Sequence, residues 1–368
     1  MAQATYELRV YNASGALVYV LDDAAFTYTK RVNAPGFLQF YVDGSHRVTG
    51  QLSRDYQVEV WRKWAADSGE SNSITNAADF RGFVRDEERR ADADGNTRVI
   101  YYCPGQMDLL RRAIVAYGAG VANRSKFTTQ KAETILKNLV KYNLTSSGTT
   151  GDGRVRNADE TSITIQTDAA GGNTLDYACS YATVLDALQE VAAIGGGDFD
   201  LVKTGATAWE FRFYTGQLGT DRSASVIFAL QYGNMANPVL RRNWLNETTI
   251  AIVGGQGEGT SRATAVRTGT NHSATTNSVE MFVDARDLTT TAGLQARGDN
   301  ALYKSEARDN LTFDVIQTPG SLYGLHYTLG DLVTGYYEGV TATQQIYGVT
   351  VGLGESGQES IGVELRNV

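Results

Sequence analysis

Cysteine and histidine are scarce in this chain. Its 368 residues include only two cysteines, Cys103 and Cys179, and three histidines, His46, His272 and His326. The wide separation of the cysteines excludes a disulfide framework and a metal-binding cysteine pair, and we expect both to be buried free thiols. No histidine lies close to another in the sequence, so we expect no zinc site either.

Long apolar runs and an excess of positive charge are also missing. No apolar run reaches the roughly 18 residues of a membrane span, so we expect no membrane insertion. The chain has 33 Lys and Arg against 41 Asp and Glu, a net charge of −8. Sequence-specific nucleic-acid binding needs clustered Lys and Arg, and this composition argues against it. An acidic lumen would instead let DNA pass without adhering.

Glycine and tyrosine, by contrast, are abundant. The chain has 39 glycines and 20 tyrosines but 4 prolines, and 42% of its residues are hydrophobic. That proportion is ordinary for a globular protein and differs from a disordered composition. Tyrosine, threonine and valine favour strands, so we expect a mainly β protein. The length allows two or three domains.

The N-terminal third has the pattern of hairpins. Residues 6–11 alternate polar and apolar side chains, a turn follows at 12–15, and the apolar segment 17–21 returns, which predicts a hairpin. Segments 26–32 and 37–42, on both sides of a turn at 33–36, are read in the same way, and a further strand is expected at 97–103. The stretch 64–79 is largely polar and rich in Ser, Asn and Asp, so we expect an exposed loop that contacts neighbours or a lumen.

Helical spacing of apolar residues marks four further segments. These are residues 107–115, 129–142, 181–193 and 289–306. Thr128 or Thr129 is expected to cap the second helix, and the glycine run 195–197 is expected to stop the third. The first three helices alternate with short strands, which predicts a mixed α+β insert.

Two stretches near opposite ends of the chain share one pattern. Residues 55–84 and 330–351 each contain an alternating strand, a gap and a returning strand. A glycine, Gly82 or Gly348, precedes the last alternating residues of each returning strand. We interpret this repeat as two related β-barrels, and three copies of a two-barrel chain can build a six-fold-like ring.

Together these patterns predict a mainly β fold with an α+β insert between two related, tube-like β-barrel domains. The expected limits are 1–103 for the N-terminal barrel, 104–230 for the insert, and 231–368 for the second barrel-like domain with its helix. This architecture indicates a ring or tube component rather than an enzyme.

The glycine run 254–259 is the most tempting ligand site. It follows a strand, as phosphate-binding loops do, but its spacing is not Gly-x-Gly-x-x-Gly and no Walker lysine is present. An alternating segment follows it instead of a helix. We therefore interpret residues 254–260 as a hairpin loop, another contact to neighbours or a lumen, in which glycine supplies positive φ.

Asp198 and Asp200 flank Phe199, so on a strand their carboxylates share one face. Paired carboxylates can exchange protons or bind a cation, but a solvated strand end is the simpler interpretation. The same interpretation applies to Glu258, Asp284 and Asp287. The chain has no Gly-x-Ser-x-Gly motif and no arguable Cys-His or Ser-His-Asp grouping. We therefore predict no catalytic, cofactor-binding or metal-binding residue.

Aromatic and basic residues give two weaker candidates. A sugar-binding platform is conceivable from the four tryptophans Trp61, Trp64, Trp209 and Trp244. Two of them, Trp61 and Trp209, lie in alternating strands, which favours core or interface positions. The arginine pairs 89–90, 111–112 and 241–242 are more consistent with ion pairs between subunits than with a nucleic-acid surface.

Short motifs follow one another in a characteristic order along nearly the whole chain. They are Asn33-Ala34-Pro35-Gly36-Phe37, residues 58–62 with Phe80-Arg81-Gly82-Phe83-Val84, Tyr102-Cys103-Pro104-Gly105 with residues 108–112, Ala132-Glu133-Thr134 with Leu139-Val140, residues 185–189, Gly233-Asn234-Met235, residues 252–257 and Leu329-Gly330-Asp331-Leu332-Val333. Their order, more than any one motif, resembles the siphophage tail-hub family of ReqiPepy6 Gp37-like proteins.

The resemblance implies a structural virion protein of a siphovirus, a baseplate hub at the tail tip. In that family type a homotrimer caps the distal end of the tail tube, and its two barrels mimic the six-fold tube. Implied partners are a distal tail or tube protein, the tape-measure protein and a central fibre or spike. The hub would assemble in the bacterial host cytoplasm, close the tail and open for DNA ejection. The family pattern supplies no catalytic residue and no cofactor.

Two other functions stay open at this point. A tail-associated cell-wall hydrolase would use Asp198, Asp200 or Glu258. A secreted carbohydrate-binding protein for receptor recognition is the second, but the start Met1-Ala2-Gln3-Ala4 lacks the pattern of a signal peptide, and we expect none.

Overall fold

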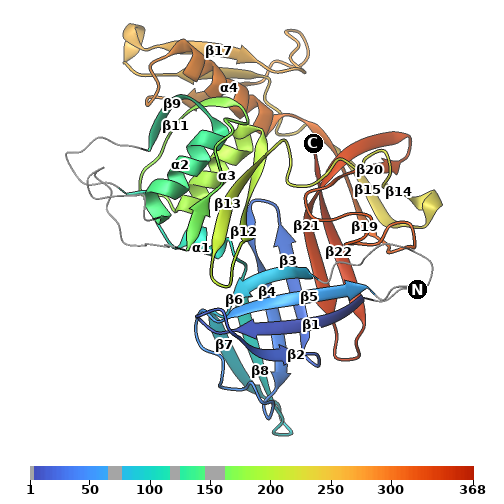
Figure 1. Ribbon diagram of the computed structural model, residues 1–368. Coiled ribbons are helices and arrows are strands. Elements are labelled where there is room, and N and C mark those ends of the chain that lie inside the picture. Colours follow the sequence, from blue (N-terminus) through green and yellow to red (C-terminus); the bar gives the residue numbers. More distant parts are fainter. Residues whose placement is uncertain (1–3, 65–76, 117–124, 146–161) are drawn as a thin grey trace.

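Strands make up most of the chain, as the sequence predicts, and few helices lie between them (Figure 1). The computed structural model describes residues 4–64, 77–116, 125–145 and 162–368. Most of the predicted contact loop 64–79 lies outside these residues, as does the side chain of Trp64. No helix in the described ranges is long and apolar enough to cross a membrane.

A four-stranded antiparallel sheet forms the first layer. Its strands are β1 (Ala4–Tyr11), β2 (Leu17–Leu21), β5 (Gln57–Trp64) and β6 (Ala77–Phe83). Their order is β2-β1-β5-β6. Because side chains alternate along a strand, Tyr6, Leu8 and Val10 of β1 are buried while Glu7 and Arg9 lie on the other face.

A larger sheet joins the two ends of the chain. Its strands are β3 (Ala25–Arg31), β4 (Ala34–Asp43), β7 (Asp86–Ala91), β8 (Thr97–Pro104), β14 (Ile227–Ala229), β20 (Leu332–Tyr337), β21 (Val340–Leu353) and β22 (Glu359–Asn367). The order is β14-β20-β21-β3-β4-β8-β7, and β22 branches from β21. The N-terminal strand β3 therefore pairs directly with the C-terminal strand β21.

The repeated sequence pattern is confirmed as two antiparallel hairpins, β5–β6 and β20–β21. They lie in different sheets, yet Val58 and Phe80 of the first hairpin and Val333 and Ile346 of the second belong to one continuous apolar core. Every sheet among the described strands has free ends. Hydrogen bonds within this chain therefore do not close the two barrels that the sequence led us to expect.

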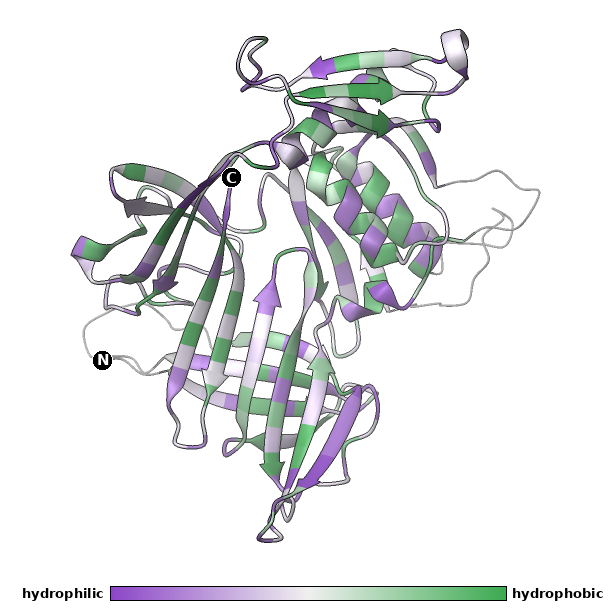
Figure 2. Cartoon of the chain, turned by 180° about the vertical axis from the view of Figure 1, so that it is seen from behind, coloured by the Kyte–Doolittle hydropathy of each residue, from purple (hydrophilic) through white to green (hydrophobic). Residues whose placement is uncertain are grey.

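The C-terminal strands wrap around their own group of aromatic rings within that core. A further antiparallel pair, β15 (Met235–Asn243) and β19 (Arg308–Val315), completes this region. The Phe228 ring lies 5.6 Å from that of Phe313 and 5.5 Å from that of Tyr327, measured between centroids. Figure 2 shows the matching stripes of hydrophobic residues along the strands of both sheets.

The insert is a mixed α+β unit, as predicted. Its elements are α1 (Asp108–Arg111), β9 (Lys126–Lys131), α2 (Ala132–Leu144), β10 (Ile163–Ile165), β11 (Thr174–Ala178), α3 (Val184–Gly195), β12 (Gly197–Lys203) and β13 (Trp209–Thr215). Helices α2 and α3 pack on each other and on the sheet β10-β13-β12 around a separate apolar core. The limits 1–103, 104–230 and 231–368 stay predictions.

The ends of the helices test the expected caps. Thr183 caps α3 by accepting a hydrogen bond from Asp186 N, and Gly196 ends it in the left-handed conformation at φ 66°. The expected cap of α2 by Thr128 or Thr129 is wrong. Both threonines lie in β9, which pairs with β11, and the helix begins after Lys131 without a side-chain cap.

A small unit lies between β15 and β19. It contains β16 (Ile250–Gly254), β17 (Thr264–Thr268), β18 (Glu280–Asp284) and α4 (Thr291–Ser305), so the helix expected at 289–306 is present. Helix α4 covers one face of the sheet β17-β16-β18 around its own small core. Asn243 pairs with Arg308 at the ends of β15 and β19, so a two-stranded neck carries this unit (Figure 1).

Replacing Gly105 by alanine should lower the free energy of unfolding by about 1–3 kcal/mol, the usual cost of overpacking. Gly105 bridges to Gly82 where β6 meets the end of β8, and a Cβ on Gly105 would lie 1.7 Å from the Pro35 carbonyl oxygen. Urea unfolding measures the change. Gly320→Ala is the matched control, because a Cβ there meets nothing within 4 Å. Equal stabilities of the two variants would contradict the prediction.

Candidate functional site

The carboxylate of Asp198 lies at the junction between the insert and the two large sheets. It accepts hydrogen bonds from Asn33 Nδ2 at 2.8 Å, Leu218 N at 2.9 Å and Gln345 Nε2 at 2.7 Å. The residue is buried. These donors come from three distant parts of the chain, so Asp198 holds the junction together and is not the solvated strand end expected from the sequence.

Asn33 completes this junction from the β3–β4 turn. It takes a positive φ of 57°, which asparagine tolerates better than most residues. Its side-chain oxygen accepts from Phe199 N at 2.7 Å, and its carbonyl accepts from Gln189 Nε2 at 2.8 Å. The turn expected at residues 33–36 therefore fixes both β12 and α3 to the β region.

Asp200 has a different environment from Asp198. Its carboxylate accepts from the backbone N–H of Leu201 at 2.7 Å. Burial raises the pKa of Asp200 above its usual range. The structure thus places the two acids on one strand, as predicted, but Asp198 is engaged in interdomain hydrogen bonds. They do not form a pair of carboxylates open to a substrate.

A partly buried ionic cluster around Asp79 connects strands from both ends of the chain. Lys30 Nζ lies 2.8 Å from Asp79 Oδ1, and the hydroxyl of Tyr323 lies 3.0 Å from both carboxylate oxygens. Tyr28 also donates to this carboxylate. Burial alone would raise the pKa of Asp79, but the attraction of Lys30 outweighs it and the pKa is lowered.

Arg62 extends the cluster toward the C-terminal hairpin. Its guanidinium lies 2.8 Å from Glu359, and it donates to Tyr6 Oη at 2.7 Å and to the Tyr323 carbonyl at 2.6 Å. Tyr6 also donates to Glu359. No sequence pattern identified this cluster, because Arg62 and Glu359 are 297 positions apart.

Glu59 forms a third junction, on the outer face of the four-stranded sheet. Lys203 of β12 lies 2.8 Å from its carboxylate, Arg81 lies 3.3 Å away, and Trp61 Nε1 donates to it at 2.8 Å. Burial opposes ionisation of Glu59, but these cations and hydrogen bonds lower its pKa. The end of the β12–β13 hairpin is thereby tied to β5.

The glycine run does not form an anion site. Arg262 donates to the carbonyls of Gly255 at 3.1 Å and Gly254 at 3.0 Å, so this part of the loop presents acceptors to its own arginine. Gly257 has a φ of 105°, as expected for a glycine turn. Among the other candidate acids, Asp284 and Asp287 pair with neighbouring arginines and Glu258 is exposed.

Cysteine and histidine positions give no metal centre. Cys103 is a buried free thiol, as expected, and burial raises its pKa, whereas Cys179 is only half-buried. Across the described ranges, no group of three or more His, Cys, Asp or Glu residues is arranged to hold a metal ion.

The tryptophans are dispersed rather than gathered. Trp209 is buried against Phe83, the ring of Trp61 lies 3.9 Å from the Arg9 guanidinium, and Trp244 is 65% exposed. These three tryptophans, whose side chains the structure describes, form no common platform. Four arginines of the predicted pairs have acidic partners within the chain: Arg89 with Glu87, Arg90 with Glu88, Arg111 with Asp108, and Arg112 with Asp55 and Asp108.

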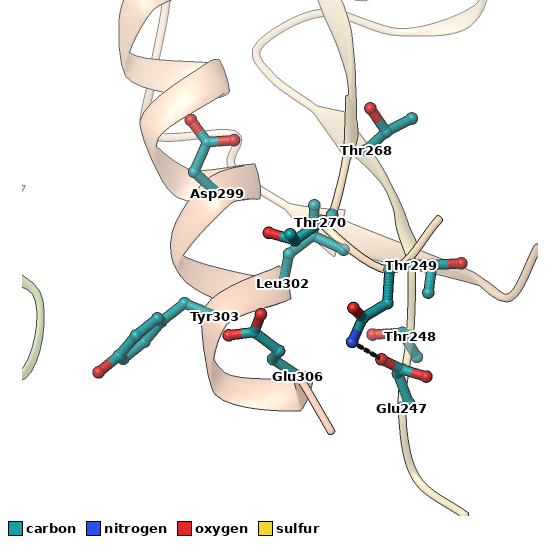
Figure 3. A pocket seen from close by; sticks show the side chains of 11 residues that line it. Glu247, Thr248, Thr249, Thr268, Thr270, Asp299, Leu302, Tyr303 and Glu306 are labelled. Atoms are coloured by element: carbon teal, nitrogen blue, oxygen red, sulfur yellow. Dashed lines mark hydrogen bonds between the residues drawn. The ribbon is translucent and has the colours of Figure 1, made fainter. Parts of the chain in front are cut away.

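An oxygen-rich cavity of about 190 Å³ lies between the C-terminal half of α4 and the segments 247–249 and 268–271, which precede β16 and lie at the end of β17. Figure 3 shows Glu247, Asp299 and Glu306 around it together with several threonines. Glu247 accepts from Asn271 at 2.8 Å and from Asn277 at 2.9 Å, and these bonds lower its pKa. The sequence analysis did not identify this cavity, because its lining comes from three separate segments.

Comparison with known proteins assigns the chain to a family. A family model described as Siphovirus ReqiPepy6 Gp37-like protein matches residues 7–365. The chain belongs to this family. The resemblance seen in the ordered motifs is thereby confirmed. No curated protein matches the sequence.

Solved structures with this fold include several tail proteins. The tail protein from Neisseria meningitidis MC58 is 12% identical with a TM-score of 0.58, over 100% of this chain and 97% of that one. The 43 kDa tail protein of prophage MuSo2 from Shewanella oneidensis is 14% identical with a TM-score of 0.58, over 98% of both chains. A chain of the Francisella PdpA-VgrG complex is 11% identical with a TM-score of 0.54, over 100% of this chain and 58% of that one. The fold is therefore one that phage tail proteins share.

Asp198→Asn and Asp200→Asn should change stability in opposite directions at pH 7. Asp198→Asn weakens a junction in which three donors meet one carboxylate, so the free energy of unfolding should fall by about 1–3 kcal/mol. The second removes a carboxylate whose raised pKa makes its charged form unfavourable in the folded protein, so stability should rise. That gain should disappear as the pH falls below the unfolded pKa of about 3.9. Urea unfolding at several pH values measures both effects, and equal losses would contradict the assignment.

Asp79→Asn should lower the free energy of unfolding at pH 7 by about 1–3 kcal/mol, because it leaves Lys30 without its partly buried counter-charge. The lowered pKa of Asp79 means that its contribution is present above the ordinary value near 3.9 and is lost as the pH falls further. The difference in unfolding free energy between Asp79→Asn and the unmodified chain should therefore become smaller in acid. The control is Asp94→Asn at an exposed position, and its unfolding free energy should stay within about 0.5 kcal/mol of that of the unmodified chain.

Proposed function

We propose that this chain is the baseplate or tail-tip hub of a siphovirus, and that a homotrimer caps the distal tail tube and passes DNA during infection. One observation carries the proposal: β21 joins the N-terminal and C-terminal β regions into a continuous sheet. One chain thus presents two β units in a fixed relation, and three chains present six around an axis. Within the trimer, these units would complete the two tube-like barrels.

Strand edges support an assembly role. Strand β7 is an edge made of Asp86-Glu87-Glu88-Arg89-Arg90-Ala91, a charged sequence that blocks pairing with other chains (Figure 2). Strand β2 is also an edge, but Leu17, Val18 and Val20 are 51%, 40% and 36% exposed. An exposed apolar edge favours pairing or packing against another subunit, and we assign β2 to the subunit interface.

The proposed partners follow from the same role. A hub touches a distal tail or tube protein above, the tape-measure protein within, and a central fibre or spike below. The net charge of −8 suits a DNA passage, because like charge disfavours adhesion of the phosphate backbone. The location is the tail tip of the virion, after assembly in the host cytoplasm.

A cell-wall hydrolase is the weaker alternative. It would need an acid and a base open to substrate, whereas Asp198 is engaged at a junction and Glu258 lies apart from it on an exposed loop. We propose that the chain has no catalytic activity of its own.

Light scattering on the purified protein tests the hub. We expect three times the chain mass of 39.9 kDa. Val18→Lys combined with Val20→Lys should reduce the trimer to monomer with little change in circular dichroism, because charge on β2 opposes the contact. Val266→Lys, on an exposed strand of the small unit, is the matched control and should leave the trimer intact. A monomeric unmodified protein would contradict the trimer, and a trimeric β2 variant would contradict the interface.

A further inference from the structure

One face of helix α4 packs closely against the sheet of its own unit. Gly298 faces this sheet, and a Cβ on it would lie 2.8 Å from both Val253 Cγ2 and Arg267 Cγ. Arg267 also forms an ion pair with Asp299 of the helix at 2.6 Å. Leu294 of α4 is buried in the small core that the helix shares with the sheet. A helix packed this closely moves together with its sheet, so the small unit behaves as one rigid body.

Another face of α4 meets the insert loosely. A cavity of about 480 Å³ separates the helix from β11 and the end of α3 (Figure 1). Leu175 and Ile194 of the insert line this cavity, as do Leu288 and Ala296 of the small unit. Tightly packed protein interiors leave few voids larger than a water molecule. The cavity therefore reduces the apolar contact that α4 would lose on leaving the insert.

A carboxylate of the insert lies against the N-terminus of α4. A Cβ on Gly293, in the first turn of the helix, would lie 2.7 Å from Asp176 Oδ2. The N-cap residue Thr290 donates its hydroxyl to the same oxygen at 3.4 Å. The helix dipole attracts a negative charge at this position, and salt screens the attraction. Asp176 thus supplies an electrostatic contact between the insert and the small unit.

The insert orients this carboxylate from its own side. Asp176 Oδ1 accepts a hydrogen bond from Thr129 N at 2.6 Å. Thr129 has a φ of 53°, in the left-handed region that β-branched residues rarely adopt. The bond compensates this unfavourable backbone conformation and keeps the carboxylate directed at α4.

The neck is slender where it leaves the β regions. Leu240 and Leu311 still pack with the apolar core of those regions. Beyond them the neck consists of residues 241–243 paired with residues 308–310. Leu245 follows and is 87% exposed, so its side chain does not brace the end of the neck. Hinges are commonly a few residues at the ends of structural elements, and this short ribbon has that position.

We infer that the small unit is hinged, turning about the neck and resting on the insert through Asp176 at the N-terminus of α4. In the closed arrangement, which the structure shows, α4 faces the insert across the cavity. In the open arrangement water hydrates Asp176 and the first turn of α4 separately. The inference goes beyond the hub role and does not depend on it, because neither β2 nor β21 takes part in the Asp176 contact.

Distances between two spin labels test the hinge on the full chain. The labels are attached to cysteines that replace the exposed residues Asp186 of α3 and Thr264 of β17, with Cys179→Ser to avoid a third label. Dilution with unlabelled chains removes distances between subunits. We expect two populations of distance, and the longer one should grow when salt is raised from about 20 mM to about 500 mM. A single narrow distance that salt does not change would overturn the inference.

Variants of the insert test the role of Asp176. Asp176→Ala should raise the ratio of open to closed molecules about two- to fivefold, the loss expected for one charge at a helix terminus. Asp176→Asn should raise it by nearly as much, because it keeps an acceptor for Thr129 but loses the charge. Asp168→Ala is the control, since Asp168 is an exposed carboxylate whose hydrogen bonds stay within the insert.

An unchanged ratio in both Asp176 variants, or an equal rise in Asp168→Ala, would overturn the Asp176 contact. Light scattering on the same variants should show an unchanged oligomer. A failure of the hinge is thereby distinguished from a failure of the hub proposal, which the mass of the unmodified protein tests.

Discussion

Strand β21 is the element on which the remaining structure depends. It pairs with β20 along its first half, with β3 along its second half and with β22 on its other side. Its Gln345 also donates to Asp198, so the strand that joins the two β regions also seats the insert. A partner from the first 31 residues and one from the last 10 must therefore meet before the core is complete, which makes the fold a product of long-range contacts.

Charges that are buried or partly buried at the junctions specify this arrangement rather than supply chemistry. Asp79, Glu59 and Glu359 each face a cation from another part of the chain. Burying such ions costs desolvation energy, so the pairs add little net stability, but leaving one ion unpaired costs much more. A misplaced insert or hairpin would leave these charges unpaired. The junctions thus make alternative packings of the insert and the hairpins unfavourable. A subunit that must hold its two β units in one fixed arrangement needs this selectivity.

Much of the secondary structure follows from local patterns, whereas the junctions do not. Strand β1 alternates visibly, and α3 ends at Gly196 as glycine chemistry predicts. Strand β7 carries almost only charged residues and forms because β8 offers it an edge. Pairing of β9 with β11 likewise overrides the caps expected at Thr128 and Thr129. The repeat predicted both hairpins but not their shared core, because a sequence pattern does not say which sheets pack together.

The insert and the small unit are attached to the β regions by different interactions. The insert is held by buried groups, with Asn33 and Asp198 on one side and Glu59 and Lys203 on the other. The small unit is carried by a two-stranded neck and touches the insert through polar contacts at its surface, such as Thr290 with Asp176. Moving the insert would expose unpaired buried charge, whereas moving the small unit exchanges surface contacts for water. The small unit can therefore shift without disturbing the β regions, because the ion pairs described at the junctions do not involve it.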